Sequence, residues 1–412
     1  MSRVPIPSKA PVFVPNSYDL SVDHGLDVAG FLLAFASALL AAKLFGEIAE
    51  RLRQPAVLGE LVAGLLLGPS VLGLVPLSAG MSLVAEIGIV LLLFEVGLET
   101  DLEELIRVGG PAIVVALAGM LLPFGGAYAL ARVVGLSPLT ALFVGAAMTA
   151  TSIGITARVL AELGALKTRE GRIILGAAVV DDILGLVLLA VVARIVETGT
   201  VAPGEMAKAA GLAIGFLVLA LVVGIPLGKR WMNAVGRAGV RGMLVSGAVG
   251  FALLVAVAAR KSGSAEIVGA FAAGLVLART NRRHDIDQAL KPVVDIFAPL
   301  FFVVVGAQVD VGLLDPLAVS NRQALGLAAG LTAIGFLGKF AAGFCAWGAV
   351  RRAFIGAGMV PRGEVGLIFA SIGKSTGALP RGIFVAVVLA VFATTFLAPP
   401  LLKGLRPPTA AA

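Results

Sequence analysis

Two adjacent acids, Asp181 and Asp182, lie in the middle of an apolar stretch that runs from Gly171 to Ile195. Inserting a charged carboxylate at the centre of a membrane-spanning helix costs about 2.5–3.5 kcal/mol of free energy on insertion scales. Helix packing does not require two such residues in one segment. A carboxylate at this depth can hold either a proton or a metal cation. The pair therefore predicts a site at which these two ions compete.

The two acids cannot act as a matched pair on one ligand. One residue step along a helix turns the side chain by about 100°. We therefore expect one acid to face a cavity and the other to face a neighbouring helix, so that Asp181 and Asp182 have different roles.

Lys339 is a third ionisable residue deep in an apolar segment, LTAIGFLGKFAAGF. A lone buried ammonium group needs a partner, and the two aspartates are the best candidates. The alternative is that Lys339 extends along its helix to the membrane surface, as lysines near helix ends do. Its position about sixteen residues into the segment favours a salt bridge with one aspartate, which leaves the other for the ion.

Two apolar segments are interrupted by polar and helix-breaking residues, at 148–159 (MTATSIGITARV) and at 356–367 (GAGMVPRGEVGL). Unwound backbone at membrane depth occurs only where it is buried or lines a cavity, and a pair of such breaks marks the binding site of many transporters. In the first break, Thr151 and Ser152 could bind a cation such as Na⁺ or could hydrogen-bond freed backbone groups. In the second, we expect Arg362 and Glu364 to neutralise each other and to support the break around Gly363.

The composition places all of these residues in a membrane. Hydrophobic residues make up 59% of the 412-residue chain, charged residues make up 14%, and the mean hydropathy is +1.02. A soluble domain of this composition would have too little polar surface. We predict an all-α polytopic membrane protein with about thirteen spans: 27–49, 55–75, 81–98, 109–132, 137–160, 172–196, 207–228, 240–260, 264–280, 292–309, 323–349, 355–373 and 382–402.

The net charge of +7 reflects topology rather than nucleic-acid binding. Basic residues such as Arg51, Arg53, Lys229 and Arg230 concentrate in alternate loops, which the positive-inside rule places in the cytoplasm. For an odd number of spans this predicts an N-terminus outside and a C-terminus in the cytoplasm.

Spans four to six and eleven to thirteen each contain one broken segment, and their spacing predicts an inverted repeat.

Glu60 and Glu95 are secondary candidates for functional carboxylates within the membrane. Glu60 opens the second predicted span, and Glu95 lies near the inner end of the third, where a carboxylate can reach water.

These motifs together resemble the monovalent cation/proton antiporter superfamily, in its branch of NapA-type and Kef-type proteins. The resemblance covers nearly the whole chain and rests on residues 54–73, 91–101, 150–164, 179–187, 337–339 and 361–367. It is greatest for NapA-type Na⁺/H⁺ antiporters, which carry the double aspartate and the later lysine.

The resemblance implies an NhaA- and NapA-like fold with two crossed discontinuous helices, and a homodimer in the cell membrane that serves pH homeostasis. It implies that Asp182 carries the cation or the proton, and that Asp181 pairs with Lys339 and is released when the ion binds. Exchange would be electrogenic, by elevator-like movement, with no cofactor. The expected single integral domain has an N-terminal tail at 1–26, dimerisation helices mainly at 27–108 and 207–291, and transport helices mainly at 109–206 and 292–405.

Other functions are weaker alternatives. A Kef-like K⁺/H⁺ antiporter remains open, because carboxylate and hydroxyl ligands alone do not select Na⁺ or Li⁺ over K⁺; the absence of a Kef-type C-terminal domain argues only against ligand-gated efflux. A potassium channel would need a carbonyl-lined filter motif such as TVGYG, which the chain lacks. An intramembrane aspartyl protease needs two carboxylates that face each other, with one of them protonated.

Overall fold

The computed structural model describes residues 28–100, 109–166, 168–198, 203–237, 240, 242–315, 317–318 and 321–405, which are helical with no β-strand. The predicted tail at 1–26 lies outside these residues. In chain order the α-helices are α1 (Val28–Arg51), α2 (Ala56–Leu67), α3 (Ala79–Glu99), α5 (Gly109–Val133), α6 (Pro138–Ala147), α7 (Ile153–Glu162), α8 (Arg169–Thr198), α9 (Pro203–Val235), α10 (Met243–Lys261), α11 (Glu266–Ala278), α12 (Arg283–Ala307), α13 (Arg322–Ala342), α14 (Arg352–Met359), α15 (Glu364–Ser375) and α16 (Arg381–Gly404). Two short 3₁₀ turns, Val311–Leu314 and Gly343–Cys345, follow α12 and α13.

The predicted all-α membrane architecture is confirmed. Each of the thirteen predicted spans coincides with one helix or, at the two breaks, with a pair of helices. Within the described ranges, nine helices are long and apolar enough to cross a membrane, and four further apolar helices are shorter. The total of thirteen crossings therefore stays a prediction.

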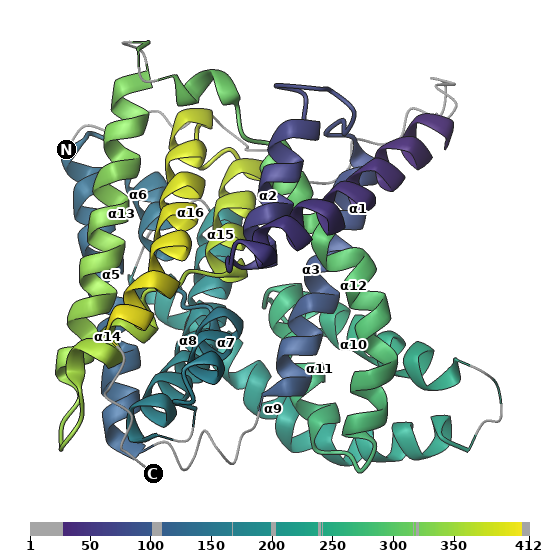
Figure 1. Ribbon diagram of the computed structural model, residues 1–412. Helices are drawn as coiled ribbons and strands as arrows, with labels where there is room; N and C mark the ends of the chain where they lie inside the picture. Colours follow the sequence, from purple (N-terminus) through teal and green to yellow (C-terminus); the bar gives the residue numbers. More distant parts are fainter. Residues whose placement is uncertain are drawn as a thin grey trace.

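The helices form two groups (Figure 1). In the first group, α1, α2 and α3 pack with α12, and α3 packs with α11, which is flanked by α9 and α10. In the second group, α5 to α8 pack with α13 to α16. The backbones of α2 and α12 touch, because a Cβ atom added to Gly64 would lie only 2.0 Å from the carbonyl oxygen of Val303.

The second group is built from an inverted repeat. The contacts of α5 with α6 and α8 recur as the contacts of α13 with α14 and α16. A Cβ atom at Gly119 would meet Ala342 at 3.6 Å, and one at Gly126 would meet Ile334 at 2.7 Å. The later residue of α5 thus contacts the earlier residue of α13. These two corresponding helices therefore run antiparallel, as the sequence predicted.

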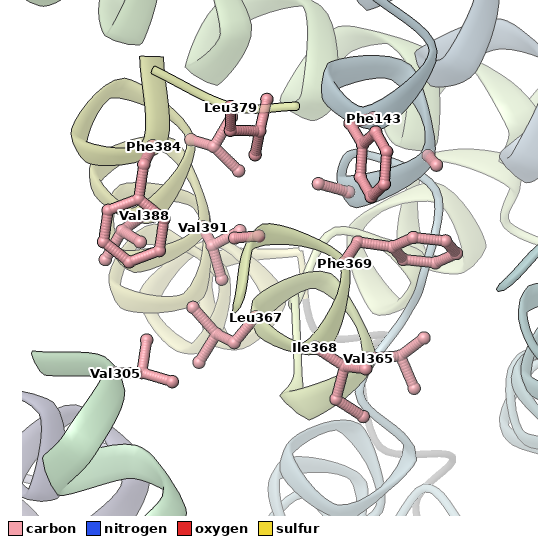
Figure 2. Close-up of a cluster of buried hydrophobic side chains, with 14 of the residues drawn as sticks. Phe143, Val305, Val365, Leu367, Ile368, Phe369, Leu379, Phe384, Val388 and Val391 are labelled. Carbon is pink, nitrogen blue, oxygen red and sulfur yellow. The ribbon is translucent and has the colours of Figure 1, made fainter. Parts of the chain in front are cut away.

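Apolar packing holds the second broken helix in place. Figure 2 shows Leu367, Ile368 and Phe369 of α15 among Phe143 of α6 and Val391 of α16, and all five side chains are buried. These side chains pack closely against α6 on one side of α15 and against α16 on the other. This packing fixes the position of α15. The polar start of α15 is therefore held at a defined place inside the protein.

Candidate functional site

The two breaks cross each other inside the second group. One separates α6 from α7 and the other separates α14 from α15. The amide N–H of Ser152 donates to the carbonyl oxygen of Pro361 at 2.9 Å, and the hydroxyl of Thr151 donates to that of Met359 at 3.3 Å. The first break therefore donates hydrogen bonds to main-chain carbonyl groups of the second break, which have no partner within a helix there.

Gly363 permits this crossing. A Cβ atom at this position would lie 2.8 Å from Cβ of Ser152, which is too close for two carbon atoms. Its φ of −128° is ordinary extended backbone. The requirement for glycine here is therefore one of space between the two breaks.

Arg362 supports the break through main-chain groups. Its buried guanidinium donates to the carbonyl oxygens of Met148, of Ala150 at 3.3 Å and of Gly335 at 3.0 Å. The positive charge therefore lies at the carboxyl end of α6, where the helix dipole favours a cation. The side chain of Glu364, the expected partner, lies outside the described residues.

Asp181 and Lys339 form a buried salt bridge. Nζ of Lys339 on α13 lies 2.7 Å from Oδ2 of Asp181 on α8, and the two side chains are 0% and 1% exposed. The other carboxylate oxygen of Asp181 is buried without a hydrogen-bond partner in the described part of the chain. Gly119 of α5 lies beside the ammonium, since a Cβ atom at this position would be in van der Waals contact with Nζ at 3.5 Å.

Asp182 is also buried, with 8% of its surface exposed. It shares a face of α8 with Gly185, three residues later, where an added Cβ atom would meet Val365 of α15 at 3.6 Å. Asp182 therefore lies one helical turn from the contact of α8 with the start of α15, close to the second break. Thr151 and Ser152, the predicted cation ligands, are buried in the first break.

The structure thus brings most of the predicted residues to one region. Asp181, Asp182 and Lys339 meet beside the crossing that Thr151, Ser152 and Arg362 build. Such a site can exchange a cation for protons because one carboxylate is held by an ammonium and a second buried carboxylate is next to it in the chain. Sequence reasoning missed that Arg362 bonds to backbone carbonyls, although a buried arginine beside a glycine break is the signal for it.

Glu60 and Glu95 lie elsewhere, between helices of the first group. Both line a cavity of about 380 Å³ between α1, α2, α3 and α12. The carboxylates of Glu95, Glu99 and Asp287 also approach within 4.8 Å of one another.

Comparison with known proteins gives concordant matches. Residues 35–405 match the family described as sodium/hydrogen exchanger, transmembrane. The chain is 40% identical to the high-affinity Na⁺/H⁺ antiporter NhaS3 of Synechocystis sp., over 92% of this chain and 90% of that protein. It is 38% identical to the Na⁺/H⁺-K⁺ antiporter GerN of Bacillus cereus, over 90% and 95%. The sodium proton antiporter MjNhaP1 from Methanocaldococcus jannaschii has the same fold, with a TM-score of 0.69 at 19% identity over 91% of this chain and 96% of that one.

Proposed function

The chain belongs to the sodium/hydrogen exchanger family, and we propose that it exchanges Na⁺ for protons at Asp182. It is a multi-pass membrane protein and a cation/proton antiporter, a transporter rather than an enzyme. The observation that carries the proposed site is the Asp181–Lys339 salt bridge beside Asp182, at two crossed helix breaks. Potassium is the second candidate cation, because GerN is named for both Na⁺ and K⁺.

In the proposed cycle, Asp182 holds a proton or a cation, and Lys339 responds to which of the two is bound. When the cation enters, Asp181 turns its charge from Lys339 toward the ion, and the freed ammonium loses a proton. The unpartnered Oδ1 of Asp181 is available for this exchange, since it has no competing hydrogen bond within the described structure. One proton from Asp182 and one from Lys339 for each Na⁺ would make transport electrogenic.

We propose that the second helix group moves as a transport core against the first group as a scaffold. Their contact includes an apolar cavity of about 170 Å³ between Leu61 of α2, Gly306 of α12 and Phe392 of α16. An apolar surface with few specific bonds offers little resistance to sliding. Because α12 packs on α1, α2 and α3, we place the boundary between scaffold and core after α12, and not at residue 292 as the sequence predicted.

The first group is also the proposed dimer interface. Helix α1 exposes large apolar side chains, including Leu33 at 64% and Leu40 at 72%, which must face lipid or a second copy. We propose a homodimer in the cell membrane, with the N-terminus outside and the C-terminus in the cytoplasm, as the distribution of basic residues favours.

The proposal is tested with the purified protein in sealed vesicles that carry an imposed pH gradient and an internal pH dye. Adding Na⁺ is expected to collapse the gradient at lower concentration than adding K⁺, with Li⁺ near Na⁺. Equal or better activity with K⁺ would assign the potassium alternative. No response to any monovalent cation would contradict exchange altogether.

Replacing Lys339 with alanine is expected to change coupling more than cation binding. Without the ammonium, only the proton on Asp182 is exchanged, so the ratio of protons to Na⁺ should fall from about two to about one. An imposed membrane potential should then cease to drive exchange, which a potassium diffusion potential set by valinomycin measures. Lys208→Ala, on the exposed surface of α9, is the control. Complete loss of Na⁺ binding in Lys339→Ala would contradict the switching role.

A further inference from the structure

The charged residues that line the cavity between α1, α2, α3 and α12 are nearly all acids. Its walls include Glu47, Glu50, Glu60, Glu95 and Asp295, against one lysine, Lys43. A concave surface that carries one sign of charge raises the local concentration of the opposite ion. This cavity therefore favours cations.

Glu60 differs from the acids at the mouth of the cavity. Asp295 pairs with Lys43 at 3.5 Å and Glu47 pairs with Arg51 at 2.9 Å, and all four of these side chains are more than half exposed. Glu60 is 8% exposed, and it has no hydrogen bond or ion pair within the described part of the chain. A buried carboxylate without a partner is costly unless a ligand supplies the missing charge.

The cavity also leads toward the transport site. A second cavity of about 250 Å³ shares Glu50, Ala56 and Val57 with the first. Its far wall includes Ile155 of α7, three residues after Ser152 in the first break. The second cavity, which Arg53 and Lys403 also line, thus extends from the residues it shares with the first cavity to α7, the helix that follows the first break.

We propose that Glu60 is a second binding site for a monovalent cation, occupied before the ion reaches Asp182. This inference rests on the proposed function, since it concerns the route to the same transport site. One carboxylate with water as the other ligands would bind the ion weakly, so that the ion can leave again. The site would serve only the membrane face on which the α1–α2 turn lies, because Glu60 is in the first turns of α2.

The test measures the apparent KM for Na⁺ of Glu60→Gln separately at the two membrane faces, in right-side-out and in everted vesicles. The KM at the face of the α1–α2 turn should rise by about three- to tenfold, while the KM at the other face and the maximal rate stay unchanged. Glu60→Asp, which keeps the charge, should recover much of the affinity. Glu266→Gln, an exposed carboxylate on α11 paired with Arg260, is the matched control and should have no effect.

A change in ionic strength distinguishes long-range attraction of Na⁺ by the exposed acids from binding of Na⁺ at Glu60. Attraction by the exposed acids weakens when the ionic strength is raised with choline chloride, whereas the effect of a buried site persists. A KM in Glu60→Gln equal to that of the unaltered protein, an equal rise at both faces, or a difference that disappears in high choline chloride would each overturn the proposal. Because the unaltered protein is measured alongside, a failure of antiport itself would be seen separately.

Discussion

Replacing Asp182 with asparagine is expected to abolish proton movement driven by Na⁺ while the protein stays folded. The change keeps the shape of the side chain but removes both the negative charge and the ability to carry a proton. A carboxylate within about 4 Å of a cation supplies several kcal/mol in a partly buried setting, so the rate at any accessible Na⁺ concentration should fall by at least about 100-fold. The pH-dye assay in sealed vesicles measures this loss.

The neighbouring acid gives the informative comparison. Asp181→Asn should leave a residual exchange, because Asp182 remains, but it leaves the buried ammonium of Lys339 without its partner at 2.7 Å. Removing one member of a buried pair costs about 3–5 kcal/mol, so this variant, unlike Asp182→Asn, should melt at clearly lower temperature. Asp285→Asn, on the exposed first turn of α12, controls for the change of charge. Full cation-driven dequenching in Asp182→Asn would refute the assignment of Asp182.

Much of the fold could be predicted from the sequence because a membrane imposes simple rules. Apolar length sets the number of helical segments, and the polar, glycine-rich runs at 148–159 and 356–367 cannot continue a buried helix undisturbed. Both runs are breaks in the structure. An ammonium as deep as that of Lys339 also needs a counter-charge, and α8 carries the nearest acids.

The carbonyl partners of Arg362 and the surroundings of Glu60 could not be predicted, because both depend on how distant helices pack. Local spacing suggested Glu364 as a partner of Arg362, but it did not indicate that the guanidinium also reaches carbonyl groups of α13 and of the first break. The sequence placed Glu60 only near the start of its predicted span. In the structure α1, α3 and α12 surround it and leave a cavity, which no pattern within residues 55–75 reports.

Arg362 should therefore be essential to the fold of the site rather than to the chemistry of the ion. Arg362→Gln removes a buried charge and most of the donors to Met148, Ala150 and Gly335. Each buried acceptor left without a donor costs about 1–3 kcal/mol, so the free energy of unfolding should fall by about 3 kcal/mol or more. Unfolding in mixed micelles of increasing SDS content measures this difference, and exchange should be lost with it.

The conservative variant separates charge from geometry. Arg362→Lys keeps the positive charge at the end of α6, but one ammonium on a flexible chain cannot reach three carbonyls as a planar guanidinium does. Its stability should lie between those of Arg362→Gln and the unaltered protein, whereas Arg322→Gln on the exposed start of α13 should change nothing. If Arg362→Gln instead unfolds at the same SDS content as the unaltered protein but no longer binds Na⁺, the guanidinium acts on the ion and not on the crossing. The crossed breaks would then be held by the hydrogen bonds of Thr151, Ser152, Thr156 and Thr395 together with the apolar packing of α15.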